Sequence, residues 1–259
     1  MFVSTLGIPL IPVLVGIAFL SGVGITTVGP GGIFVTIALY SLTGIPSGTV
    51  AGTAHATFVA TGVVGSAAYL HSGELKTGDA RVLVLVLSLS SAGGALIGAH
   101  ANAFVPRATF GLLLGLVATV TGITIVYREK RGLSPLYEVD ASSRTGRVAL
   151  GVLGLALGIA SGVVGVGGPV IAVPALILIG VPMLPAVAVA QVQSIFIAAF
   201  ATAGYGFRGD VSVPLAVLVG LPLLAGVVVG WRVAHVVDPR RLKLALGVVL
   251  IVAGAYIAL

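Results

Sequence analysis

The sequence predicts an all-α integral membrane protein built from two inverted repeats, each with about five apolar segments. Three observations support this fold class. The 259-residue chain is 58% hydrophobic and only 8% charged, with a mean hydropathy of +1.22, whereas a soluble domain is about 25% charged. Its apolar runs are long and do not alternate with polar residues, which favours helices over a transmembrane barrel. The order of apolar segments and glycines in the first half recurs in the second.

The first half, residues 1–127, is predicted to be the first transmembrane repeat. Its apolar segments are Ile8–Val28, Gly31–Gly44, Thr49–Leu70, Arg81–His100 and Arg107–Tyr127. The second of these is much shorter than the others. As a helix it would be about 21 Å long, against a hydrocarbon core of about 30 Å. We expect it either to cross part of the membrane or to pair with the segment before it as a re-entrant hairpin.

Residues 128–147 form the one long polar stretch and are predicted to be a cytoplasmic linker. The second transmembrane repeat is then residues 148–259. Its segments are Val148–Val166, Gly168–Gly180, Pro185–Gly206, Val211–Trp231 and Leu242–Leu259. The chain therefore has 8–10 membrane segments, depending on whether the two short ones, Gly31–Gly44 and Gly168–Gly180, span or re-enter.

One fixed offset in residue number relates the two halves. At an offset of 136, Gly31-Gly32 falls on Gly167-Gly168, and further matches are Gly44-Ile45-Pro46 with Gly180-Val181-Pro182, Tyr69 with Tyr205, and Gly94 with Gly230. Ser21 matches Ser161 at an offset of 140, which implies four extra residues in the first half. Because five segments is an odd number, the second repeat enters from the opposite side. The repeats are therefore predicted to be inverted.

The basic residues support this topology. If all ten segments change sides, 11 of the 13 basic residues lie on one face, and only Arg107 and Arg208 lie on the other. A re-entrant pair made of the first two segments would give the same distribution. The positive-inside rule then predicts that the face rich in basic residues is cytoplasmic. The chain is thus expected to be a multi-pass cell-membrane protein with its N-terminus on the outer side. The net charge of +6 is thus a topology signal, and no basic face with interleaved aromatic residues indicates nucleic-acid binding.

The two glycine-rich breaks are the main candidate binding site. Gly31-Gly32 and Gly167-Gly168 each precede a short apolar segment, and a break at the same place in two halves points to the binding site of a secondary transporter. The breaks would open short helices whose free N–H groups face inward, and such a terminus attracts anions. The alternative is that these glycines only allow helices to pack closely.

Polar residues in the third segment of each half are further candidates. His55 aligns with Gln191 and Thr57 with Gln193 at the same offset. Gln191 and Ser194 are three residues apart and share a helix face, whereas Gln193 points elsewhere and is expected to form an interhelical hydrogen bond. Histidine exchanges protons near neutral pH, so His55 could pair with an anion or relay a coupling proton. A neutral histidine bonded to a backbone carbonyl is the alternative.

The residues around the second break resemble a known family over nearly the whole chain. They are Ser161-Gly162, Gly165, Gly167-Gly168-Pro169, Pro174, Gly180-Val181-Pro182, Gln191, Gln193, Ser194, and Tyr205 before Gly209. In this pattern the chain resembles the sulfite exporter TauE/SafE family of membrane permeases. The first half departs from it, with Gly29-Pro30-Gly31-Gly32 and with Ala38 where the second half has Pro174. The resemblance implies export of a small anion such as sulfite, thiosulfate or an organosulfonate.

The function expected from these observations is secondary transport of a small sulfur-containing or organic anion by alternating access. The anion would be held at the breaks in mid-membrane, and the substrate-binding candidates are Gly31, Gly32, His55, Thr57, Gly167, Gly168, Gln191, Gln193 and Ser194. Protons are the expected coupling ion, and a homo-oligomer is left open. The alternatives are a passive anion channel and a non-transporting membrane scaffold or sensor. No enzyme, cofactor or metal site is expected, since the chain has no cysteine and no convincing catalytic pair.

Overall fold

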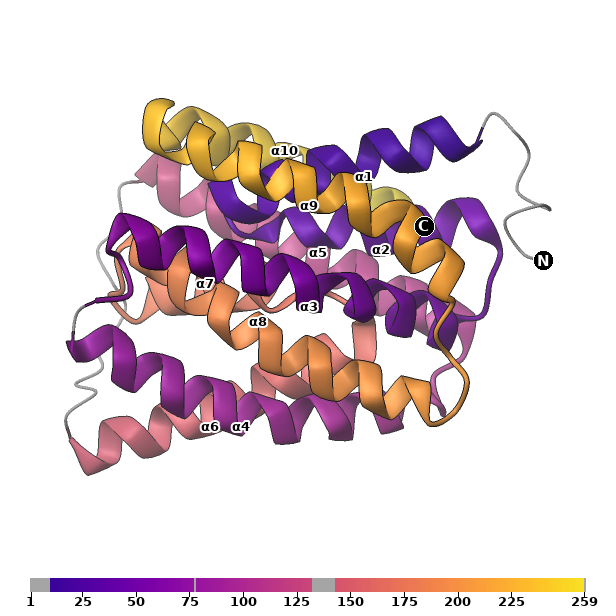
Figure 1. Ribbon diagram of the computed structural model, residues 1–259, viewed down its shortest axis with the longest axis horizontal. Helices are drawn as coiled ribbons and strands as arrows, with labels where there is room; N and C mark the ends of the chain where they lie inside the picture. The colour runs from indigo at the N-terminus through magenta and orange to yellow at the C-terminus, as the bar shows by residue number, and fades with distance from the viewer. Residues whose placement is uncertain (1–9, 77, 132–142, 259) are drawn as a thin grey trace.

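The computed structural model describes residues 10–76, 78–131 and 143–258. Every regular element in these ranges is a helix (Figure 1). The elements are α1 (Leu10–Thr27), the 3-10 helix η1 (Pro30–Gly32), α2 (Ile33–Thr43), α3 (Ser47–Ser72), α4 (Gly78–Asn102), α5 (Arg107–Arg131), α6 (Arg144–Val164), α7 (Gly168–Leu178), α8 (Met183–Gly206), α9 (Val213–Val236) and α10 (Pro239–Ala258).

All ten predicted apolar segments form helices, so the predicted fold class is confirmed. Within the described residues, seven helices are long and apolar enough to cross a membrane. Helix α3 is also long, but glycine, threonine and histidine lower its hydropathy. Helix α5 continues to Arg131 and α6 begins at Arg144, so both ends of the predicted linker 128–147 are helical. Its middle, residues 132–142, lies outside the described residues.

Helix packing shows that the two halves are inverted repeats. The equivalent helices are α1 and α6, α2 and α7, α3 and α8, α4 and α9, and α5 and α10. Helix α4 packs on α6 as α9 packs on α1, and α4 packs on α8 as α9 packs on α3 (Figure 1). Equivalent helices α3 and α8 run antiparallel, because Gly52 lies against Tyr205 while Gly65 lies against Gln191. Helices α5 and α10 are also antiparallel neighbours. Two copies related in this way cross the membrane in opposite directions.

Glycines with left-handed backbone angles repeat at the same spacing. They form three pairs related by the offset of 136, with φ between 65° and 110°: Gly29 with Gly165, Gly44 with Gly180, and Gly73 with Gly209. Each pair lies at a turn after equivalent helices, where a side chain would strain the backbone. The first pair shows that the offset of 136 holds at the break itself. The four extra residues inferred from Ser21 and Ser161 are therefore wrong at this point.

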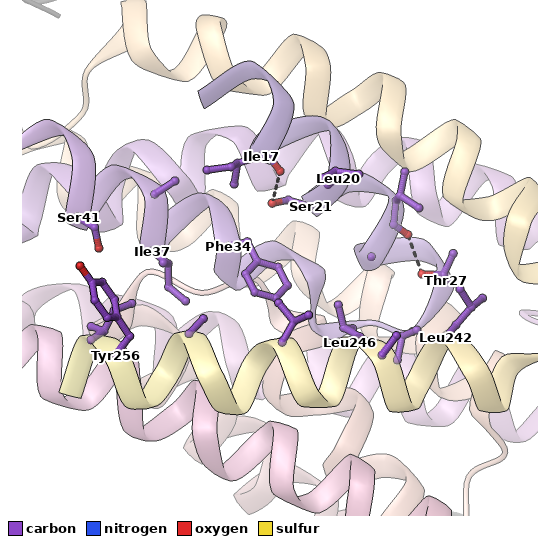
Figure 2. A pocket seen from close by; sticks show the side chains of 18 of the residues that line it. Ile17, Leu20, Ser21, Thr27, Phe34, Ile37, Ser41, Leu242, Leu246 and Tyr256 are labelled. Atoms are coloured by element: carbon purple, nitrogen blue, oxygen red, sulfur yellow. Dashed lines mark hydrogen bonds between the residues drawn. The ribbon is translucent and has the colours of Figure 1, made fainter. Parts of the chain in front are cut away.

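Helices α1 and α2 form a hairpin. Helix α1 runs parallel to α9, with Gly22 against Leu223, and ends beside Val227 although α9 continues to Val236. Helix α2 then runs back along α1, since Ile17 and Ser21 of α1 line one cavity with Phe34 and Ile37 of α2 (Figure 2). At the far end of α2, the Arg107 guanidinium donates to Tyr40 O at 2.6 Å and also bonds Ile45 O. The tip of the hairpin therefore stops inside the bundle.

Contacts between helix ends define a basic end of the bundle. There α3 meets α9, with His235 Nε2 at 3.2 Å from Glu74 Oε1, and α5 meets α10, with Lys243 Nζ at 2.8 Å from Glu129 Oε2. Arg107 and Arg208 lie at the opposite end, where α4 turns into α5 and α8 turns into α9. This grouping agrees with the predicted charge distribution. That the basic end faces the cytoplasm, and that the N-terminus is outside, stay predictions.

Impermeant thiol labelling tests the topology, because the native chain has no cysteine. We expect Lys76→Cys and Arg240→Cys to be labelled from one side of the membrane, the cytoplasmic one. Phe104→Cys and Phe207→Cys serve as controls, since both side chains are exposed at the opposite end, and they should be labelled only from the other side. Labelling of the two basic-end positions from different sides would contradict the inverted arrangement.

Candidate functional site

The two glycine breaks meet in the middle of the bundle. A methyl group at Gly29 would lie 2.6 Å from Val173 Cγ2, so the first break touches the helix that follows the second. The Phe58 ring lies between the two breaks: a methyl group would be 3.2 Å from it at Gly32 and 3.5 Å from it at Gly167. A methyl group at Gly168 would lie 3.0 Å from Ser194 Cα. These contacts agree with the prediction from the sequence that the two breaks come together.

The carbonyl groups at the broken end of α1 receive donors from two other helices. The Tyr69 hydroxyl donates to Thr26 O at 2.5 Å, and Gln191 Nε2 donates to Ile25 O at 3.1 Å. The last carbonyls of a helix have no partner within it, and an unpaired carbonyl inside a membrane costs several kcal/mol. These two side chains therefore stabilise the break.

Helix α6 ends in the same way. The Tyr205 hydroxyl donates to Gly162 O at 2.7 Å, and His55 Nε2 lies 3.1 Å from Ser161 O. A carbonyl only accepts, so Nε2 carries the proton in this bond. The acceptors Gly162 and Ser161 correspond to Thr26 and Ile25 at the same offset of 136. Each repeat thus binds the broken helix of the other through one polar side chain, His55 or Gln191.

The helix termini at this site differ in what they can still bind. The negative ends of α1 and α6 already accept hydrogen bonds from side chains. The helices that begin at the breaks, η1, α2 and α7, have no side-chain cap at their N-termini among the described residues. A helix N-terminus carries about half a positive charge and unpaired N–H groups. These N-termini thus place partial positive charge at the centre without relying on a lysine or arginine side chain.

The predicted polar residues divide between two faces of their helices. His55 and Gln191 hold the broken helices, and Ser194 contacts Gly168. Thr57 instead faces α9, where a methyl group at Gly220 would lie 3.5 Å from Thr57 Cγ2. The structure thus does not bring Thr57 to the breaks. The reason is the helix period, which places residues 55 and 57 about 200° apart.

Gln193 has the position of Thr57 in the second repeat and so lies on the face of α8 away from Gln191. Its side chain is fully buried, and neither amide atom has a hydrogen-bond partner among the described residues. The expected interhelical hydrogen bond is therefore not formed within the described part of the chain. Gly31 also has a packing role, since a methyl group there would lie 2.4 Å from Ile25 N of α1.

Phe58 is the residue at the centre that sequence reasoning missed. It is 1% exposed and its ring lies edge-on to His55, with 6.2 Å between the ring centroids. An aromatic residue in an apolar helix resembles any core residue. The alignment of the repeats could have identified Phe58, because the offset of 136 aligns it with the predicted binding residue Ser194.

A cavity of about 540 Å³ between α1, α2 and α10 reaches the first break but suits an apolar occupant. Figure 2 shows the Phe34 ring pointing into it, and its lining is largely aliphatic. Two of its hydroxyl groups already donate to their own helix, Ser21 to Ile17 O at 2.7 Å and Thr27 to Val23 O at 2.8 Å (Figure 2). With no charged residue in its lining, this cavity offers little to an anion.

Nothing in the described residues forms a metal site, because no group of three His, Asp or Glu side chains comes together there. The fold and the site thus define a multi-span membrane protein with inverted repeats and paired helix breaks, an architecture typical of secondary transporters.

The chain belongs to the Sulfite exporter TauE/SafE family, whose model matches residues 14–257. It is therefore a membrane permease of the anion-exporter type rather than an enzyme. No curated protein and no solved structure matches the chain.

The tyrosine–carbonyl bonds predict a matched pair of effects. Tyr69→Phe and Tyr205→Phe each remove one hydroxyl donor and leave a buried carbonyl short of a partner. Each should lower the stability of the protein by about 1 kcal/mol, measured as a lower midpoint of thermal unfolding in detergent. Tyr256→Phe is the control, because that side chain is 78% exposed. Equal midpoints for all three variants would show that the two bonds contribute nothing.

Proposed function

We propose that this permease is a secondary transporter that holds a small oxyanion, such as sulfite, thiosulfate or an organosulfonate, between the two helix breaks. The observation that carries the proposal is the meeting of uncapped helix N-termini at Gly32 and Gly168 in the middle of an inverted-repeat bundle. Family membership supports the same class of substrate. Export by alternating access is part of the proposal.

Electrostatics favours an anion over a cation at this position. Donor side chains occupy the carbonyl ends of α1 and α6, which would otherwise attract a cation. The N-termini of the short helices have no side-chain cap among the described residues, so their positive ends remain to attract an anion. A small anion also needs close approach to the backbone, which the absence of side chains at Gly32, Gly167 and Gly168 permits.

A transporter fits the packing better than a passive channel does. A channel needs a continuous path for water and ions, but the Phe58 ring fills the space between Gly32 and Gly167. Movement of the helices around the breaks would be needed to open the site to one side at a time. Inverted repeats supply this, since two halves that exchange conformations produce the opposite-facing state.

His55 is the residue that we propose couples transport to protons. Its Nε2 is used in the bond to Ser161 O, whereas its Nδ1 has no hydrogen-bond partner among the described residues. A proton can therefore bind at Nδ1 without breaking the bond that holds α6. The resulting positive charge would lie beside the breaks and attract the anion.

Flux in liposomes tests the substrate and the site together. The wild-type protein should exchange ³⁵S-labelled sulfite or thiosulfate, in a panel that includes sulfoacetate and sulfate, with and without a pH gradient. Gly167→Ala adds a methyl group near Phe58 at an ordinary contact distance of 3.5 Å. We expect it to weaken the apparent affinity about fivefold, because it shields the backbone at the N-terminus of α7 from the anion, with little change in thermal stability.

The matched control is Gly93→Ala, because a methyl group at Gly93 has no atom within 4 Å. Its neighbour Gly94 is unsuitable, since a methyl group there would lie 2.3 Å from Leu155 O. Gly93→Ala should leave affinity unchanged. If Gly167→Ala also leaves affinity unchanged, the anion does not bind at this break.

The repeat itself suggests the best test of the proton role. His55→Gln puts into the first repeat the residue that the second repeat has at Gln191, where the amide makes the equivalent carbonyl bond. The variant should fold with near-normal thermal stability but lose the dependence of flux on a pH gradient, because glutamine cannot be protonated. Unchanged proton-coupled flux would assign His55 to holding α6 alone.

A further inference from the structure

A small cavity at the basic end lies directly beside the central breaks. Its volume is about 60 Å³, and it lies between the end of α5, the start of α10 and helix α7. Val28 and Val173 form its inner wall. Val173 also packs on Gly29 of the first break. The cavity thus lies between the breaks and the basic end.

The mouth of this cavity is charged, unlike the apolar cavity beside α1. Its lining includes the cations Arg128 and Lys243 and one carboxylate, that of Glu129. Lys243 Nζ lies 2.8 Å from Glu129 Oε2, and this pair joins α10 to α5. The two side chains are 21% and 20% exposed. The site therefore has a partly buried ammonium group whose present partner is a carboxylate of this chain.

Arg107, the equivalent of Lys243 in the first repeat, makes different contacts. At the offset of 136, Lys243 aligns with Arg107. The Arg107 guanidinium is fixed at the end of α2 by two backbone carbonyls and lies 4.4 Å from the centroid of the Tyr40 ring. Lys243 instead has a carboxylate partner, which is the same kind of group as an anionic substrate. A lysine is also a compact point charge on a flexible stem, which can change partners.

We propose that Lys243 captures the transported oxyanion at the basic end and that Glu129 competes with the anion for it. This inference rests on the proposed function and adds to it a second binding site on the route to the breaks. An arriving anion displaces the Glu129 carboxylate from the Lys243 ammonium group. When the anion moves on toward Gly29, the ammonium group pairs with Glu129 again. The carboxylate thereby keeps the site from holding the anion too tightly for transport.

The test compares the effects of removing the two charges. In liposomes containing the full-length protein, the half-saturating concentration of ³⁵S-sulfite is measured for Lys243→Gln and for Glu129→Gln. Lys243→Gln should raise it roughly fivefold, and Glu129→Gln should lower it roughly threefold, the range expected for a partly exposed charge pair. Lys243→Arg should restore most of the wild-type affinity. The matched control is Lys130→Gln, an exposed basic residue next to Glu129, which should change nothing.

A purely structural ion pair gives a different result. Both single variants then break the same bond, so they lower thermal stability together and shift the half-saturating concentration in the same direction. That outcome overturns the proposal, as does a Lys243→Gln variant that matches Lys130→Gln. Either result leaves the proposed function standing if the wild-type protein exchanges sulfite. Absence of exchange by the wild-type protein with every anion of the panel overturns the proposed function and this inference with it.

Discussion

The structure depends on pairing the backbone carbonyls that two broken helices leave in the middle of a membrane. Lipid offers no hydrogen bonds, so irregular backbone persists there only where the protein supplies partners. Tyr69 and Tyr205 supply them within each repeat, and Gln191 and His55 supply them across the two repeats. The bonds across the repeats mean that neither broken helix is complete without the other half. They therefore fix the breaks beside each other as well as stabilising each one.

This pairing also sets the electrostatics of the centre. A break exposes one negative and one positive helix end, which largely cancel if both stay open. Here side chains bond the carbonyl ends, and the N-termini at Gly32 and Gly168 lack a side-chain cap among the described residues. Under the proposed function, this arrangement is what would favour an anion without a buried cation. It would also account for anion transport by so apolar a chain.

Much of the fold could be predicted from the sequence, because segment length and a single repeat offset are local or periodic signals. The direction of the short helices could not, since a re-entrant hairpin and two crossings give the same charge distribution. The hydrogen-bond partners of His55 and Tyr69 could not be predicted either, because Ser161 and Thr26 are distant in the chain and contribute only backbone atoms. The face of Thr57, by contrast, could be predicted from the sequence, because the helix period places residues 55 and 57 about 200° apart.

The positions where the two repeats differ are the ones that can make the two membrane faces unequal. Perfect inverted symmetry would make both faces equivalent, so any difference in affinity between them must come from unmatched residues. Among the unmatched pairs are His55 with Gln191 and Phe58 with Ser194 at the centre, and Arg107 with Lys243 at the two ends. Arg107 donates to backbone carbonyls, whereas Lys243 pairs with the carboxylate of Glu129. The features common to the two repeats thus position the breaks, whereas Arg107 and Lys243 make the two ends of the bundle chemically different.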